Sequence, residues 1–151
     1  MWKIKNYRFG FDPWGLGLFL LIMLPNFVWF AVPAPDDILR MESVTPLIDA
    51  IAQVFQIIMA AALCGLVNVT PHKPVKQRCW PGITVCIALY FAGWVLYYTG
   101  ITNAIVILDL CLAPCGAFLL FALARKNAAA VISASGFTFC HLIYGIVNFI
   151  V

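Results

Sequence analysis

The stretch NAIVILDLCLAPCGAFLLFALA, residues Asn103–Ala124, is long and apolar enough to cross a lipid bilayer. It carries a single acid, Asp109, and two cysteines, Cys111 and Cys115, with Pro114 between them. An ionisable side chain at membrane depth is costly, so such residues face the interior of a helix bundle, a partner or a cavity. The stretch therefore predicts a membrane-spanning helix and marks the place where a functional site would lie.

The whole chain has the composition of an integral membrane protein. Its 151 residues are 64% hydrophobic and 10% charged, with a mean hydropathy of +1.00, whereas soluble domains are about half apolar and about a quarter charged. The nine Lys and Arg residues fall almost entirely between apolar runs. That placement suits a membrane surface and not a nucleic acid. Most of the six cysteines lie within apolar runs, unlike those of a secreted disulfide scaffold.

Four further apolar runs accompany the stretch Asn103–Ala124. Two of them start with a polar residue followed by proline, a typical helix start. We therefore expect an all-α fold, a polytopic integral membrane helix bundle that forms a single transmembrane domain over residues 1–151. The run nearest the N-terminus is expected to remain as an uncleaved span, because prolines flank the candidate signal-peptide cut after Ala34. The five predicted spans are about 13–32, 46–67, 81–100, 103–124 and 128–151.

The basic residues predict the orientation of these spans. Three lie before the first span, three between the second and third, and two between the fourth and fifth, while the first loop has only Arg40 and the third loop none. Cytoplasmic loops of membrane proteins carry the excess of Lys and Arg. We expect the N-terminus in the cytoplasm, the C-terminus outside, and a multi-pass location in the cell membrane, taken as a bacterial cytoplasmic membrane.

Two features of the first span and its loop carry local predictions. Pro25 cannot donate a backbone hydrogen bond and is expected to kink the helix, with Asn26 bonded to a neighbouring helix. In the loop, Asp36 is expected to cap a short helix running through Ser43 that lies on the membrane surface.

The second span carries a polar stripe. Asp49, Gln53 and Gln56 recur at helical spacing, so they share one face. Gln56 falls about 15 Å from the helix start by the 1.5 Å rise per residue, near the midplane of the bilayer. Asp49 lies in the first turn, where the helix dipole favours an acid. We expect this face to pack on other helices or to line a cavity.

The fourth and fifth spans bring a candidate site to one depth. Asp109 lies about 9 Å below the outer boundary, and Cys140 and His141 of the fifth span lie about 12–15 Å below it. Spans joined by a short turn pack together. We therefore predict that Asp109 and His141 are neighbours in an outward-facing polar cavity. Asn26, Gln53, Gln56 and Asp49 are the further candidates for binding a ligand or coupling protons.

Several kinds of chemistry remain open for these residues. Asp109 and His141 could couple proton movement to a solute, or simply fix helix packing. Thiolates and imidazole suit copper(I) or zinc, so a metal or thiol site is the second reading. A serine hydrolase built from a serine of Ser133-Ala134-Ser135-Gly136 and His141 as the base is the third, and its residues share one helix. The candidate metal ligands are Cys111, Cys115, Cys140 and His141.

The leading functional prediction is a non-enzymatic accessory or interaction subunit. Phosphate-binding, zinc-protease and nucleophile-elbow motifs are absent from the sequence. The first alternative is an oligomeric small-solute or proton-coupled transporter, and the second is an intramembrane thiol or metal-site protein. We expect no cofactor. The expected partners are the lipid bilayer and either a second copy of the chain or a larger membrane complex, with no nucleic acid.

Overall fold

The structure, a computed structural model, describes residues 3–4, 6–69 and 76–151 and confirms the all-α class. Five of its helices are long and apolar enough to cross a membrane, as the sequence predicts. The helices are α1 Pro13–Ala31, η1 Ile38–Arg40 (a single 3₁₀ turn), α2 Pro46–Gly65, α3 Lys76–Tyr98, α4 Ala104–Ala124 and α5 Ala128–Phe149.

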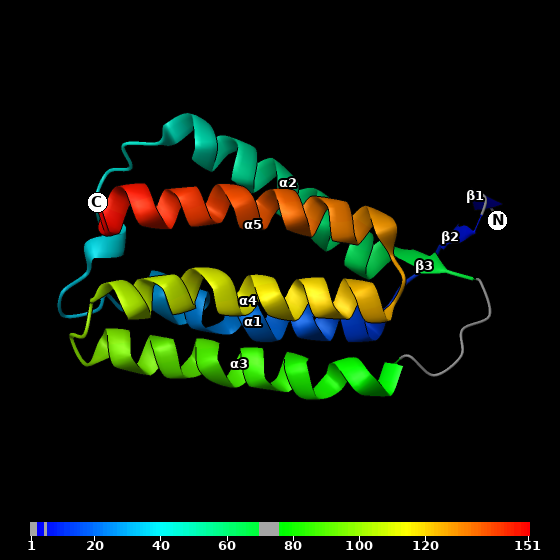
Figure 1. Cartoon of the computed structure of the whole chain (residues 1–151), viewed down its shortest axis with the longest axis horizontal. Coiled ribbons are helices and arrows are strands. Elements are labelled where there is room, and N and C mark those ends of the chain that lie inside the picture. The colour runs from blue at the N-terminus through cyan, green and yellow to red at the C-terminus, as the bar shows by residue number, and fades with distance from the viewer. Residues whose placement is uncertain (1–2, 5, 70–75) are drawn as a thin grey trace.

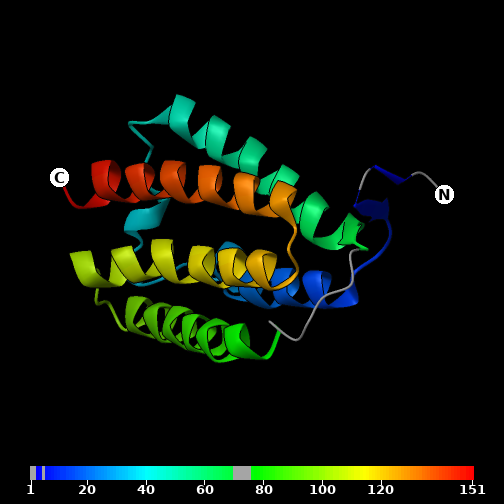
Figure 2. The same cartoon turned by 45° about the vertical axis from the view of Figure 1, so that its right-hand side comes forward.

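The five long helices run roughly along one axis. In both views α2, α5, α4 and α3 follow one another in a row, and α1 lies on one face of that row, behind α4 in Figure 1 (Figures 1 and 2). Helix α4 is the central element, since 56% of its span is buried against 22–33% for the others. The pairs α2–α5 and α3–α4 pack most extensively, and α4 also packs on α5. The predicted packing of the fourth span on the fifth is therefore confirmed.

Local signals set most helix ends. The Asp12 carboxylate accepts hydrogen bonds from the backbone N–H groups of Trp14 and Gly15, and Pro13 occupies the first position of α1. Helix α3 begins at Lys76, earlier than the predicted start at residue 81, and it therefore contains Pro81 inside the helix. Much of the basic loop before α3 lies outside the described residues.

A small antiparallel sheet, which the sequence did not predict, forms at one end of the bundle. Its strands are β1 Lys3–Ile4, β2 Tyr7–Phe9 and β3 Leu66–Asn68, in the order β1-β2-β3. The backbone N–H of Gly10 donates to the carbonyl of Gly65 and thereby joins the chain before α1 to the end of α2. We call this the sheet end of the bundle, and the opposite end, which carries residues 32–45 and 99–103, the loop end (Figure 1).

Polar contacts close the sheet end. Arg125 forms an ion pair with Asp12 at 3.0 Å, which ties the end of α4 to the start of α1. The Asn127 side chain is 2% exposed and makes three hydrogen bonds, donating to the carbonyls of Ala62 and Leu66 and accepting from the N–H of Ala130. Because these buried polar groups are satisfied, they hold α1, α2, α4 and α5 together at this end.

Helices α1 and α2 touch at the sheet end and diverge toward the loop end (Figures 1 and 2). Their close approach is at Gly15, where a Cβ would collide with the carbonyl of Leu63. Farther along, aromatic and polar side chains take up the space between the two helices. This divergence makes room for the cavity described next.

Candidate functional site

A cavity of about 370 Å³ lies between α1 and α2, against α4 and α5. Its lining runs from Leu39 and Phe149 at the loop end to Ile22 and Gln56, which lie about half-way along their helices. All five long helices and η1 contribute side chains. The volume is in the range of small-molecule binding sites, about 300–1,000 Å³.

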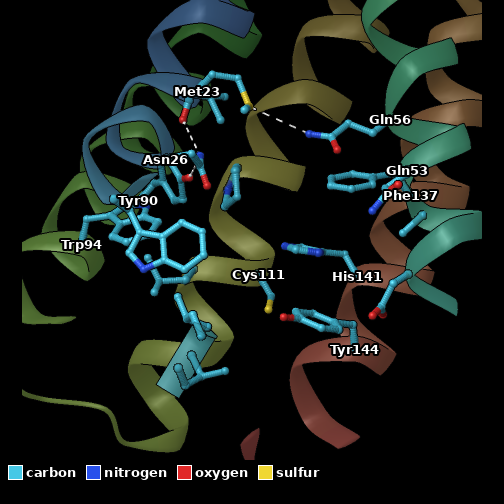
Figure 3. Close-up of a pocket in the computed structure, with 18 of the residues that line it drawn as sticks. Met23, Asn26, Gln53, Gln56, Tyr90, Trp94, Cys111, Phe137, His141 and Tyr144 are labelled. Atoms are coloured by element: carbon cyan, nitrogen blue, oxygen red, sulfur yellow. Dashed lines mark hydrogen bonds between the residues drawn. The ribbon is translucent and has the colours of Figure 1, made fainter. Parts of the chain in front are cut away.

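One wall of the cavity carries most of its polar groups. Gln53 and Gln56 of α2 line it together with His141 and Tyr144 of α5 (Figure 3). Asp49 of α2 belongs to the same lining. Thr45 Oγ1 donates to Asp49 Oδ1 at 3.1 Å, and Gln56 Nε2 has only a weak contact with Met23 Sδ at 3.9 Å. Among the described residues, the side chain of Gln53 and the ring nitrogens of His141 form no hydrogen bond, so they are free to bind a ligand.

The imidazole of His141 is held by its neighbours on α5. Its ring stacks on Phe137 with 4.9 Å between ring centroids and on Tyr144 with 5.9 Å, at interplanar angles of 18° and 13°. Residues three and four positions apart on a helix lie one above the other, which produces this stack. The stack fixes the ring orientation without using either ring nitrogen, so both remain able to bind a ligand or water.

The facing wall comes from α1 and α3. Asn26 Nδ2 donates to Tyr90 Oη at 2.7 Å and to the carbonyl of Ile22, so the predicted bond from Asn26 to a neighbouring helix is present (Figure 3). Tyr90 in turn packs edge-on against Trp94, which is 6% exposed. The indole nitrogen of Trp94 is the one buried side-chain donor without a partner in the described part of the chain. This wall is mainly aromatic.

At the loop end, the segment Pro33–Thr45, which we call the cover loop, contributes Leu39 to the cavity lining. Its Asp37 carboxylate accepts hydrogen bonds from Trp29 Nε1 at 2.8 Å and from Tyr97 Oη at 2.9 Å, and it forms an ion pair with Arg40 at 2.7 Å. Burial opposes ionisation of Asp37, but these donors outweigh it and hold the pKa of the carboxyl below its ordinary value of 3.8. Asp37 therefore ties the loop to α1 and α3.

A second tie joins the cover loop to α5. Asn148 Nδ2 donates to Thr45 Oγ1 at 2.8 Å, and Asn148 Oδ1 accepts from the N–H of Val44 at 2.7 Å.

The predicted surface helix from Asp36 to Ser43 is wrong: only Ile38–Arg40 is helical, and Leu39 lines the cavity. The Asp37 carboxylate accepts hydrogen bonds from side chains of α1 and α3, and these bonds hold the cover loop against the bundle.

The predicted pairing of Asp109 with His141 is not formed. Asp109 faces α3, where a Cβ on Gly93 would collide with Asp109 Oδ2, and it does not line the cavity. The acid that shares the cavity with His141 is Asp49. Depth along the chain brought Asp109 to the correct level, but the rotation of α4 about its axis turns it away from α5.

The candidate metal ligands are not assembled. Cys111, Cys115 and Cys140 are buried free thiols, and within the described ranges no three His, Cys, Asp or Glu residues come close enough to hold a metal ion. Cys111 packs against Gly145 of α5, as a small apolar residue does. Ser133 donates its hydroxyl to carbonyls of its own helix and does not reach His141, so the structure gives the hydrolase reading no support.

The structure thus gathers five of the six polar candidates, Asn26, Asp49, Gln53, Gln56 and His141, around one cavity and leaves Asp109 outside it. Sequence reasoning missed the aromatic wall. Tyr90 and Trp94 are four residues apart on α3, so the sequence puts them on one face of the helix. An aromatic face of a membrane helix is equally suited to contact lipid, so this spacing does not by itself predict a cavity wall.

No family model, no curated protein and no solved structure matches this chain. Function must therefore be argued from the cavity alone.

Proposed function

We propose that this chain is a non-enzymatic integral membrane protein that binds a small solute in the cavity between α1 and α2. The observation that carries the proposal is the convergence of polar side chains from α1, α2 and α5 on one cavity of about 370 Å³. Polar groups at membrane depth are costly unless they are satisfied. A bound polar molecule would satisfy the amide of Gln53 and the imidazole of His141.

The solute enters from the loop end. The sheet end is closed by the Asp12–Arg125 ion pair and by Asn127, whereas the cavity lining reaches the cover loop. The excess of basic residues in the segments before α1, around the start of α3 and after α4 favours a cytoplasmic sheet end and an outer loop end in our proposal. Access is therefore from the outer side, past the cover loop.

Cysteine accessibility tests this proposal. In a background without native cysteines, Gln53→Cys faces the cavity and Val54→Cys, 56% exposed on the outer surface of α2, is the matched control. A thiol reacts only where water allows the thiolate to form. We expect a charged, membrane-impermeant thiol reagent added outside cells to modify Gln53→Cys at least tenfold faster than Val54→Cys. Equal rates, or modification from the cytoplasmic side alone, would overturn the proposal.

The same variants separate a binding protein from a transporter. Asp49 and His141 line one cavity on facing turns of α2 and α5, an arrangement that could couple proton movement to a solute. A transporter must open the closed sheet end in a second state. Modification of Gln53→Cys from both sides of the membrane would favour the transporter, and modification from the outer side alone favours the binding protein.

A further inference from the structure

The charged groups around the cavity are unbalanced. Asp49 is the only Asp or Glu in the lining, and the lining contains no Lys or Arg. Its carboxylate receives one neutral hydrogen bond, from Thr45, and forms no ion pair with the described residues. Asp49 lies in the first turn of α2, at the positive end of the helix dipole.

The surroundings of the entrance have the same sign. Asp36, Asp37 and Glu42 lie in the cover loop, and its one basic residue, Arg40, is already paired with Asp37. The other Lys and Arg residues of the sequence precede α1, follow α2 up to Arg78 in the first turn of α3, or follow α4, so none belongs to the cover loop or to the segment between α3 and α4. The field at the loop end therefore attracts cations and repels anions.

The rest of the lining is rich in aromatic rings. Eight of its side chains are Trp, Tyr or Phe, in addition to the stacked imidazole of His141. Aromatic faces attract cations through their quadrupole, most strongly for Trp, and desolvation strengthens that attraction. The chain already shows this contact near the entrance, where the Arg40 guanidinium lies 4.7 Å from the ring centroid of Trp29.

From these features we infer that the ligand is a small organic cation, an amine or quaternary ammonium compound with an apolar body. This inference rests on the proposed function of the same cavity. Asp49 holds the cationic group, and the aromatic wall on α1 and α3 takes the apolar body. Gln53 and Gln56 take any further polar groups. An anion would face the Asp49 carboxylate. An acyl chain would leave the charge of Asp49 unpaired and the Gln53 amide without a hydrogen-bond partner, which is unfavourable in an apolar layer.

Three probes of similar size test the charge preference: benzyltrimethylammonium, 2-phenylethanol and phenylacetate. Binding is measured on the purified full chain in detergent, by thermal stabilisation and by quenching of tryptophan fluorescence. We expect the cation to bind at least tenfold more tightly than either of the other probes. Asp49→Asn keeps the side-chain shape and should weaken binding of the cation roughly tenfold or more, because it removes the charge facing the ligand.

Asp36→Asn is the matched control, since it removes the same charge from an exposed site of the cover loop outside the cavity. It should weaken binding of the cation far less than Asp49→Asn does, because this charge is exposed to solvent and does not face the ligand. Equal losses in the two variants, or a wild type that prefers the neutral probe or the anion, would overturn the inference and leave the binding proposal intact. If none of the three probes binds and Gln53→Cys is also unreactive, the proposed function fails with it.

Discussion

The contact between α1 and α2 at the sheet end offers a sharp test of the fold. A Cβ on Gly15 would lie 2.9 Å from the carbonyl carbon of Leu63 and closer still to its oxygen, whereas ordinary contacts of this kind begin at 3.4 Å. Relief of the carbon contact alone requires a shift of 0.5 Å, the difference between these two values. Both groups belong to the backbone of long helices, so no side-chain rotation can provide it.

Gly17 is the matched control on the same helix, because a Cβ there meets nothing within 4 Å. Replacement of either glycine by alanine gains the same helix propensity, about 1 kcal/mol. Only Gly15→Ala adds the collision, which should cost about 2–3 kcal/mol, the upper part of the range for overpacking. The difference between the variants therefore isolates the packing of α1 on α2.

The assay is thermal unfolding of both purified variants in one detergent, followed by tryptophan fluorescence and by helicity. At about 2–4 °C per kcal/mol for a chain of this size, the Tm of Gly15→Ala should lie roughly 4–12 °C below that of Gly17→Ala. Gly17→Ala should equal or exceed the wild type. Tm values within about 1 °C of each other would refute the close approach of α1 to Leu63, and with it the divergence that opens the cavity.

Three further predictions concern other parts of the molecule. Asn127→Ala should destabilise the protein by roughly 1–3 kcal/mol, because it removes the two side-chain hydrogen bonds to the carbonyls of Ala62 and Leu66 and the bond that caps the start of α5. A thermal unfolding curve unchanged from the wild type would contradict the closed sheet end. Gly145→Ala places a Cβ 2.5 Å from Cys111 Sγ, with the next atoms at 3.8 Å, and should therefore destabilise the protein. The double variant with Cys111→Ala should recover most of this lost stability. Additive losses in a double-mutant cycle would show that the two side chains do not touch. The lowered pKa of Asp37 means that its ionised form holds the cover loop against the bundle. The loop should therefore stay in place from pH 7 down to the ordinary carboxyl pKa of 3.8 and loosen only below that pH. Amide exchange in the loop, corrected for the intrinsic effect of pH, that already rises between pH 6 and 5 would count against this role.

The sequence was sufficient for most of what depends on one long helix at a time. Apolar length gave five helices able to span a membrane, and the cap at Asp12 gave the start of the first. Helical period also put Asp49, Gln53 and Gln56 on one face, and that face lines the cavity. These inferences succeed because rise per residue and side-chain period are properties of the helix itself.

The neighbours of a side chain were decided only by the tertiary structure. Asp109 and His141 lie at similar depth, but the rotation of α4 turns the acid to Gly93 of α3, and Asp49 of α2 shares the cavity with His141 instead. The cover loop is a further case, since the bonds from Asp37 to Trp29 and Tyr97 join residues 8 and 60 positions apart. Rotation and long-range contact depend on packing against several helices together, and no local pattern encodes that choice.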